Sequence, residues 1–71
     1  MRRGLRGRLA KSAKRLRLSR GYTQEQAAER AGLNPRHYQK IEDGAVNVTL
    51  NTLEQLCHAF AVEVGELFEQ A

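Results

Sequence analysis

Cysteine, proline and aromatic residues are scarce in this chain: among 71 residues there are one Cys, one Pro, no Trp, two Tyr and two Phe. The lone Cys57 excludes an intramolecular disulfide and a cysteine-rich zinc site, so we expect it to fill the core. No apolar run approaches the ~18 residues of a membrane-spanning helix. The basic N-terminus also lacks the apolar stretch of a secretion signal. We therefore expect a cytoplasmic protein without a membrane partner.

The patterns that mark catalytic or cofactor sites are absent too. There is no CxxC, no HExxH and no glycine-rich phosphate loop. His37 and His58 fall on separate segments, and the acidic residues are scattered. Seventy-one residues make one domain with a thin core. We expect no enzyme activity, no cofactor, no metal and no small-molecule ligand.

Charge is distributed very unevenly. Nine of the twelve Lys and Arg lie in residues 1–22, and no acidic residue precedes Glu25. Residues 23–71 hold three basic side chains against eight acidic ones. A basic block favours a polyanionic partner, nucleic acid first and an anionic membrane surface second. On charge alone, a solvated tail explains the block equally well.

Apolar spacing predicts an all-α fold with five helical segments and no strand. Leu5, Leu9 and Leu16 share one helical stripe. Because Gly4 and Gly7 weaken its beginning, we expect the first helix to start near Arg8. Residues 1–7 would then form a flexible basic arm, and residues 8–71 a single folded domain.

Two short helices with clear start and stop signals follow. Thr23 and Gln26 have the capping-box spacing, and Gly32 suits the left-handed end of a helix. Asn34 is a favoured N-cap, with Pro35 at the first helical position after it. The connection is only about three residues, so the two helices must cross steeply.

Two more helices are expected beyond residue 48. Thr49 would cap a helix whose apolar residues share one inward face: Leu50, Leu53, Leu56, Cys57 and Phe60. A short last helix would run from Val64 to Phe68. Glu63 takes its cap position, where a negative charge suits a helix N-terminus.

At 100° per residue, the helix after Asn34 has two distinct faces. Tyr38 and Ile41 point inward, whereas Arg36, Gln39 and Lys40 project outward. Arg and Lys can bond guanine O6 and N7 in the DNA major groove, and Gln suits adenine. Such side chains are also common on solvated faces. The outer face therefore indicates DNA binding only in combination with the caps and the short turn.

The ordered fragments resemble the helix-turn-helix of the Cro/lambda-repressor-like family, also called the xenobiotic-response-element family. They are residues 21–28 (GYTQEQAA), 31–33 (AGL), 41–44 (IEDG) and 49–53 (TLNTL). The resemblance runs from about Leu9 to Phe68. It implies a compact five-helix bundle and a transcriptional regulator that binds palindromic double-stranded operator DNA as a homodimer, with the third helix in the major groove.

The resemblance also implies roles for individual residues. Positions matching the family's base and phosphate contacts, with their neighbours on the same surface, are Gln24, Asn34, Pro35, Arg36, His37, Gln39, Lys40 and Asn47. His37 suits a phosphate contact or a solvated surface position about equally. Pro35 offers only an apolar contact. Arg17 and Glu42 match a structural pair that ties the first helix to the third.

Dimerisation is expected through a C-terminal apolar set of Val62, Val64, Leu67 and Phe68, some of which would serve the monomer's own core instead. A phage-type repressor and a restriction–modification controller both suit the chain. A different class, an antitoxin that neutralises a toxin by protein binding, is disfavoured because the chain ends three residues after Phe68.

Overall fold

The structure, a computed structural model, describes residues 4–68. Within that range the chain forms four α-helices and one 3₁₀ helix, with no strand. They are α1 (Leu5–Ser19), α2 (Gln24–Ala31), α3 (Pro35–Glu42), α4 (Leu50–Phe60) and η1 (Val64–Phe68). The expected all-α class is confirmed, but the expected fifth helix is a single 3₁₀ segment of five residues.

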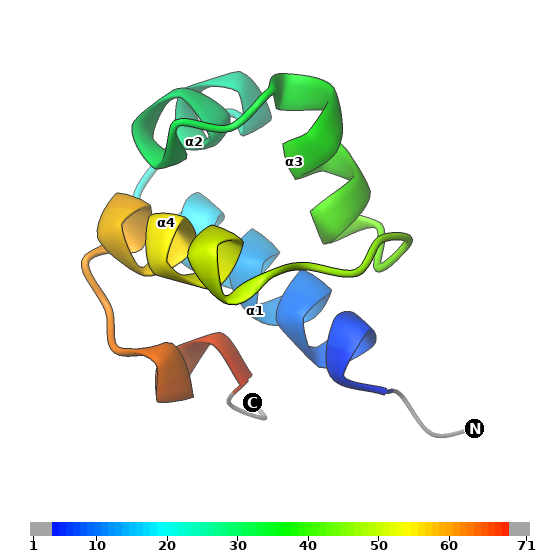
Figure 1. The fold of residues 1–71 in the computed structure, drawn as a ribbon. Helices are drawn as coiled ribbons and strands as arrows, with labels where there is room; N and C mark the ends of the chain where they lie inside the picture. Colours follow the sequence, from blue (N-terminus) through cyan, green and yellow to red (C-terminus); the bar gives the residue numbers. More distant parts are fainter. Residues whose placement is uncertain (1–3, 69–71) are drawn as a thin grey trace.

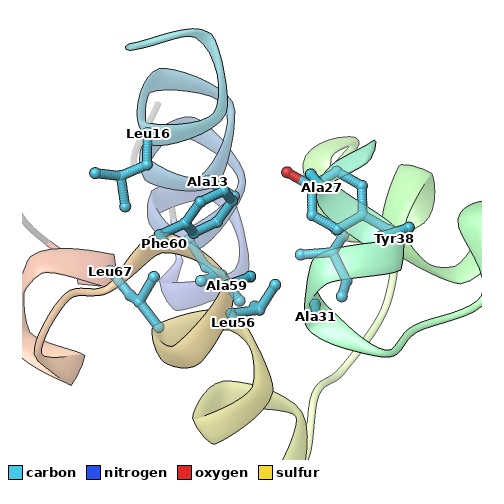
Figure 2. Close-up of a cluster of buried hydrophobic side chains, with 12 residues drawn as sticks. Ala13, Leu16, Ala27, Ala31, Tyr38, Leu56, Ala59, Phe60 and Leu67 are labelled. Atoms are coloured by element: carbon cyan, nitrogen blue, oxygen red, sulfur yellow. The ribbon is translucent and has the colours of Figure 1, made fainter. Parts of the chain in front are cut away.

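The helices surround one core. In Figure 1, α2 and α3 form the upper part of the bundle, and α1, α4 and η1 form the lower part. Figure 2 shows Phe60 of α4 beside Ala13 of α1, with Tyr38 of α3 beside Ala27 of α2. All four of these side chains are fully enclosed. Small alanines at the crossings let the backbones approach, so the large Phe and Tyr rings can fill the centre.

The first helix begins earlier than expected, at Leu5 and not near Arg8. A Cβ placed on Gly44 would lie 3.7 Å from the Arg6 carbonyl and 3.8 Å from the Gly7 Cα. The first turn of α1 therefore packs closely against the loop after α3, and this contact offsets the weak helix propensity of glycine. Of the expected arm, residues 1–3 lie outside the described residues and residues 5–7 belong to α1.

The turn between α2 and α3 follows the sequence closely. The Thr23 hydroxyl accepts from the Gln26 amide, and the Gln26 side chain accepts from the Thr23 amide. Gly32 ends α2 in the left-handed conformation, with φ of 70°. Asn34 caps α3 by accepting from the amides of Arg36 and His37. Local chemistry thus sets both ends of the turn.

The C-terminal part differs most from expectation. Leu50 is 81% exposed because the buried side of α4 centres on Thr52, Leu56 and Phe60, and Leu50 lies at the edge of the apolar stripe. Of the four C-terminal apolar residues expected at a dimer interface or in the monomer's core, Leu67 is fully enclosed in the core and so is not available to a second copy. Burying Leu67 holds η1 against α1 and α4.

Candidate nucleic-acid interface

The outer face of α3 consists of exposed polar and cationic side chains. Tyr38 and Ile41 are buried on the opposite side of the helix. Arg36, Gln39 and Lys40 are all exposed. Within residues 4–68 none of these three forms a side-chain hydrogen bond or an ion pair. Their donors are therefore available to an outside partner.

The start of α3 is fixed by its cap. The Asn34 side-chain oxygen lies 2.8 Å from the Arg36 amide nitrogen and 3.3 Å from that of His37. Because this oxygen serves the cap, only the amide NH₂ of Asn34 remains for an outside contact. Pro35 is exposed and His37 is half-buried at the flank of the same face.

One carboxylate joins the three N-terminal helices. Glu42 of α3 accepts from Arg17 of α1 at 2.7 Å (Nε to Oε2) and 3.2 Å (Nη2 to Oε1). Gln24 of α2 donates to Oε1 at 3.0 Å, and the Tyr38 hydroxyl donates to Oε2. Arg17 also donates from Nη1 to the Tyr22 carbonyl at 2.9 Å. Glu42, Arg17, Gln24 and Tyr38, called here the Glu42 cluster, therefore fix α3 relative to α1 and α2.

Burial strengthens the electrostatic interactions within this cluster. The Glu42 side chain is 3% exposed and that of Arg17 is 11% exposed. Burial alone raises the pKa of Glu42, but the hydrogen bonds from Arg17, Tyr38 and Gln24 outweigh it and hold that pKa below its usual value. Burial and the bond to Glu42 raise the pKa of Tyr38. Glu42 thus stays ionised and Tyr38 stays a neutral donor.

Gln24 and Asn47 lie outside α3, on α2 and in the loop that follows α3. Gln24 is the first residue of α2 and is half-buried, with one amide hydrogen committed to Glu42. Its backbone N–H, at the first position of α2, is not used by the Thr23 cap, and such unpaired N–H groups at a helix N-terminus attract anions. Asn47 is exposed in the loop between α3 and α4, beside Arg6 and Leu5 of α1.

Sequence reasoning missed two members of this region. Tyr38 was expected only as a core residue, yet its hydroxyl completes the Glu42 cluster. The i, i+4 spacing of Tyr38 and Glu42 was the available signal. Arg30, in the last turn of α2, lies over the Tyr22 ring at 4.7 Å from its centroid, a cation–π contact between α2 and the segment that precedes it.

A separate apolar surface lies on α4 and the segment that follows it. A shallow hollow of about 420 Å³ is lined by apolar and acidic residues: Leu50, Leu53, Glu54, Cys57, Val62, Glu63 and Val64. Val64 is 51% exposed, Val62 is half-buried, and Leu50 projects beside them. Phe68, also half-buried, lines a neighbouring hollow with Leu5 and Val48. Cys57 lies at this surface and not deep in the core, and burial raises the pKa of its thiol.

Residues 4–68 contain no group of three or more His, Cys, Asp or Glu side chains placed to hold a metal ion. No helix in this range has the length and hydropathy needed to cross a bilayer.

Comparison with known proteins gives a consistent picture. A helix-turn-helix family model matches residues 14–67. No curated protein sequence matched the chain. A hypothetical transcription factor from Neisseria superposes with a TM-score of 0.88 at 27% identity, over 93% of this chain and 76% of that one.

Two further solved structures are regulators by description. The restriction–modification controller protein C.AhdI from Aeromonas hydrophila has a TM-score of 0.85 at 30% identity, over 89% of this chain and 96% of its own. The clp gene regulator ClgR from C. glutamicum has a TM-score of 0.84 at 26% identity, over 93% of this chain and 86% of its own.

Proposed function

Because the chain belongs to the helix-turn-helix family, of the Cro/lambda-repressor-like (xenobiotic-response-element) type, we propose that it is a sequence-specific, DNA-binding transcriptional regulator. The observation that carries the proposal is the outer face of α3, where Arg36, Gln39 and Lys40 are exposed and unpaired within the described residues. Their donors suit base edges in the major groove, so α3 is the proposed recognition helix.

Phosphate contacts would surround this reading face. The free N–H groups at the start of α2, with Gln24, suit one phosphate. Asn34, His37 and Asn47 suit the flanking backbone, and Pro35 offers an apolar contact to a thymine methyl. Apart from Gln24, the Glu42 cluster would not touch DNA; it would hold α3 at a fixed angle to α2. Basic side chains in residues 1–7 would add sequence-independent attraction.

A homodimer is the proposed binding unit. Recognition helices of such dimers enter successive major grooves ~34 Å apart. The described residues measure only 32 × 21 × 20 Å and contain a single such helix. The exposed apolar surface of Leu50, Val62 and Val64 is the proposed contact between copies, with Phe68 at its margin. Cellular action on DNA, in a bacterial or phage setting, would take place in the cytoplasm.

A restriction–modification controller or a phage-type repressor is the narrower proposal. The likeness to C.AhdI over 96% of that protein supports the controller. The antitoxin alternative is not favoured, because the solved relatives are described as a transcription factor, a controller protein and a gene regulator.

The test is selection of bound sites from random double-stranded DNA, with the mass of the complex measured on the selected site. We expect a palindrome that binds two chains. A chain that enriches no sequence would overturn the proposal.

A further inference from the structure

Asp43 places an acidic side chain on the outer face of α3, at the C-cap of the helix. Its φ of −82° and ψ of −8° are helical, and its backbone N–H donates to the Gln39 carbonyl at 3.0 Å. The helical geometry therefore extends to Asp43. Seven residues after Arg36, it lies within about 20° of the same direction. Both side chains are exposed, opposite the buried Tyr38 and Ile41.

No contact within the described residues uses the Asp43 carboxylate. Its side chain forms no hydrogen bond or ion pair in residues 4–68, not even with Lys40 three residues earlier. A negative charge at a helix C-terminus is unfavourable, because the carbonyl end of a helix carries a partial negative charge. The chain turns after α3 at Gly44, which has φ of 70°. The stability of α3 therefore does not account for an acid at this position.

The distance between Arg36 and Asp43 fits the major groove. They are separated by about 10 Å along the helix axis, within the ~12 Å width of the groove. Gln39 and Lys40 lie on either side of the line that joins them. A helix that presents Arg36 to base edges therefore also brings Asp43 into the groove.

A carboxylate in the groove is unfavourable unless the DNA supplies a donor. Phosphates are anionic, so an unpaired Asp43 opposes the approach of any duplex. The donors in the major groove are the exocyclic amino groups, cytosine N4 and adenine N6, and aspartate accepts from such a group. Arg36 and Lys40 have donors only, whereas Asp43 has acceptors only. Asp43 therefore complements a feature of the bases that the cations cannot bind.

We infer, building on the proposed function, that Asp43 is a specificity-determining residue of the outer face of α3. On the selected operator its carboxylate accepts a hydrogen bond from the amino group of one base. On unmatched DNA it has no donor within reach and only repels the phosphates. The same side chain thus favours the operator and opposes binding to other sequences.

Asp43→Ala removes both the charge and the acceptor. Fluorescence anisotropy gives the affinity of the full chain for its selected operator and for a random duplex of equal length, at one salt concentration. We expect affinity for the random duplex to rise and the ratio of operator to random affinity to fall at least about tenfold. Operators changed one base pair at a time should reveal one position whose preference is lost in Asp43→Ala. The base at that position shows whether the amino group belongs to cytosine or adenine.

Asp43→Asn separates charge from acceptor, because it removes the charge and keeps one acceptor oxygen. It should raise affinity for the random duplex by a similar factor and retain more operator affinity than Asp43→Ala. Glu29→Ala is the matched control, since it removes the same charge from an exposed position on α2. It should leave the ratio of the two affinities unchanged. Circular dichroism checks that each variant folds.

An unchanged ratio in Asp43→Ala would overturn the inference. If both affinities rise together, Asp43 faces phosphates only, and if neither changes, it is solvated. A fall in the ratio without a relaxed base position, or Asp43→Asn binding the operator no better than Asp43→Ala, would exclude the accepted hydrogen bond. A wild-type chain that selects no operator would overturn the proposed function, and the inference with it.

Discussion

At the scale of single residues, Glu42 is the residue that holds the N-terminal helices together. Its carboxylate accepts from three helices, and its side chain is 3% exposed. A buried charge is tolerated only where its partners satisfy it, and here Arg17 supplies two of the bonds. Removing the charge of Glu42 leaves the guanidinium of Arg17 without its ionic partner. The expected loss of folding free energy is therefore larger than for a surface ion pair.

Glu42→Gln should therefore lower the free energy of unfolding by about 3 kcal/mol at neutral pH. Chemical denaturation followed by circular dichroism measures this. Glu54→Gln, an exposed position on α4, is the control and should change stability by less than about 0.5 kcal/mol. Equal, small effects from the two variants would mean that the Glu42 cluster is not a structural centre.

The advantage of Glu42 over Gln should also depend on pH. The folded-state pKa of Glu42 lies below its ordinary value of 4.5, so the ionised form is favoured in the folded chain. Its contribution is complete above the unfolded pKa and is lost as pH falls through the folded one. The stability gap between wild type and Glu42→Gln should stay constant from pH 7 to about pH 5.5 and shrink below about pH 4.5. A gap that widens on acidification would contradict the ion-pair account.

Arg36 is the residue on which direct readout is most easily tested. Arg36→Ala should cost about 1–3 kcal/mol on the selected operator and relax the preference at one base pair. Binding to random DNA should change much less. Fluorescence anisotropy on both DNAs measures the difference. If both affinities fall equally, Arg36 holds a phosphate and does not read a base.

At the scale of the element, the turn between α2 and α3 depends on one backbone conformation. Gly32 has φ of 70°, and a Cβ there would meet only the Gln55 side chain, at an ordinary 3.6 Å. The cost of a side chain at Gly32 is thus conformational and not steric. The direction in which the chain leaves Gly32 sets the positions of Leu33, Asn34 and α3.

Gly32→Ala should destabilise the fold by about 1 kcal/mol, because the left-handed conformation is unfavourable for a residue that has a side chain. Gly65→Ala is the matched control, since φ there is not positive and a Cβ meets nothing within 4 Å. That change should be neutral or slightly stabilising. Thermal unfolding of the two variants compares them directly, and equal melting temperatures would contradict the role given to Gly32.

At the scale of the whole molecule, function separates onto different sides of one small bundle. The α3 face holds the proposed DNA contacts, and the surface of Leu50, Val62 and Val64 holds the proposed dimer contact. A thin core of about a dozen buried apolar side chains supports both. Changes at exposed positions should therefore alter one contact without unfolding the bundle.

Leu50→Glu tests the dimer surface. Leu50 is 81% exposed in the monomer, so a charge there should leave the fold intact. We expect the dimer dissociation constant to rise at least about tenfold, because the charge would be buried between copies. Sedimentation equilibrium measures this. Leu18→Glu, at an exposed leucine on α1, should leave the dimer unchanged; if it weakens the dimer as much, the interface lies elsewhere.

Much of this architecture follows from local sequence. Thr23 with Gln26, Gly32, and Asn34 with Pro35 set the ends of α2 and α3, because capping and left-handed turns depend on neighbouring residues alone. The angular positions of Arg36, Gln39 and Lys40 follow from helical geometry once Tyr38 and Ile41 are buried.

Other features depended on contacts between distant segments, which no local pattern contains. The close approach of α1 to Gly44 extended that helix to Leu5, and burial of Leu67 drew the last segment into the core as a 3₁₀ turn. The sequence by itself determined where the helices begin and turn around the α2–α3 connection. Only the tertiary structure decided which apolar residues stayed outside and which donors surround Glu42, because both depend on how the helices pack.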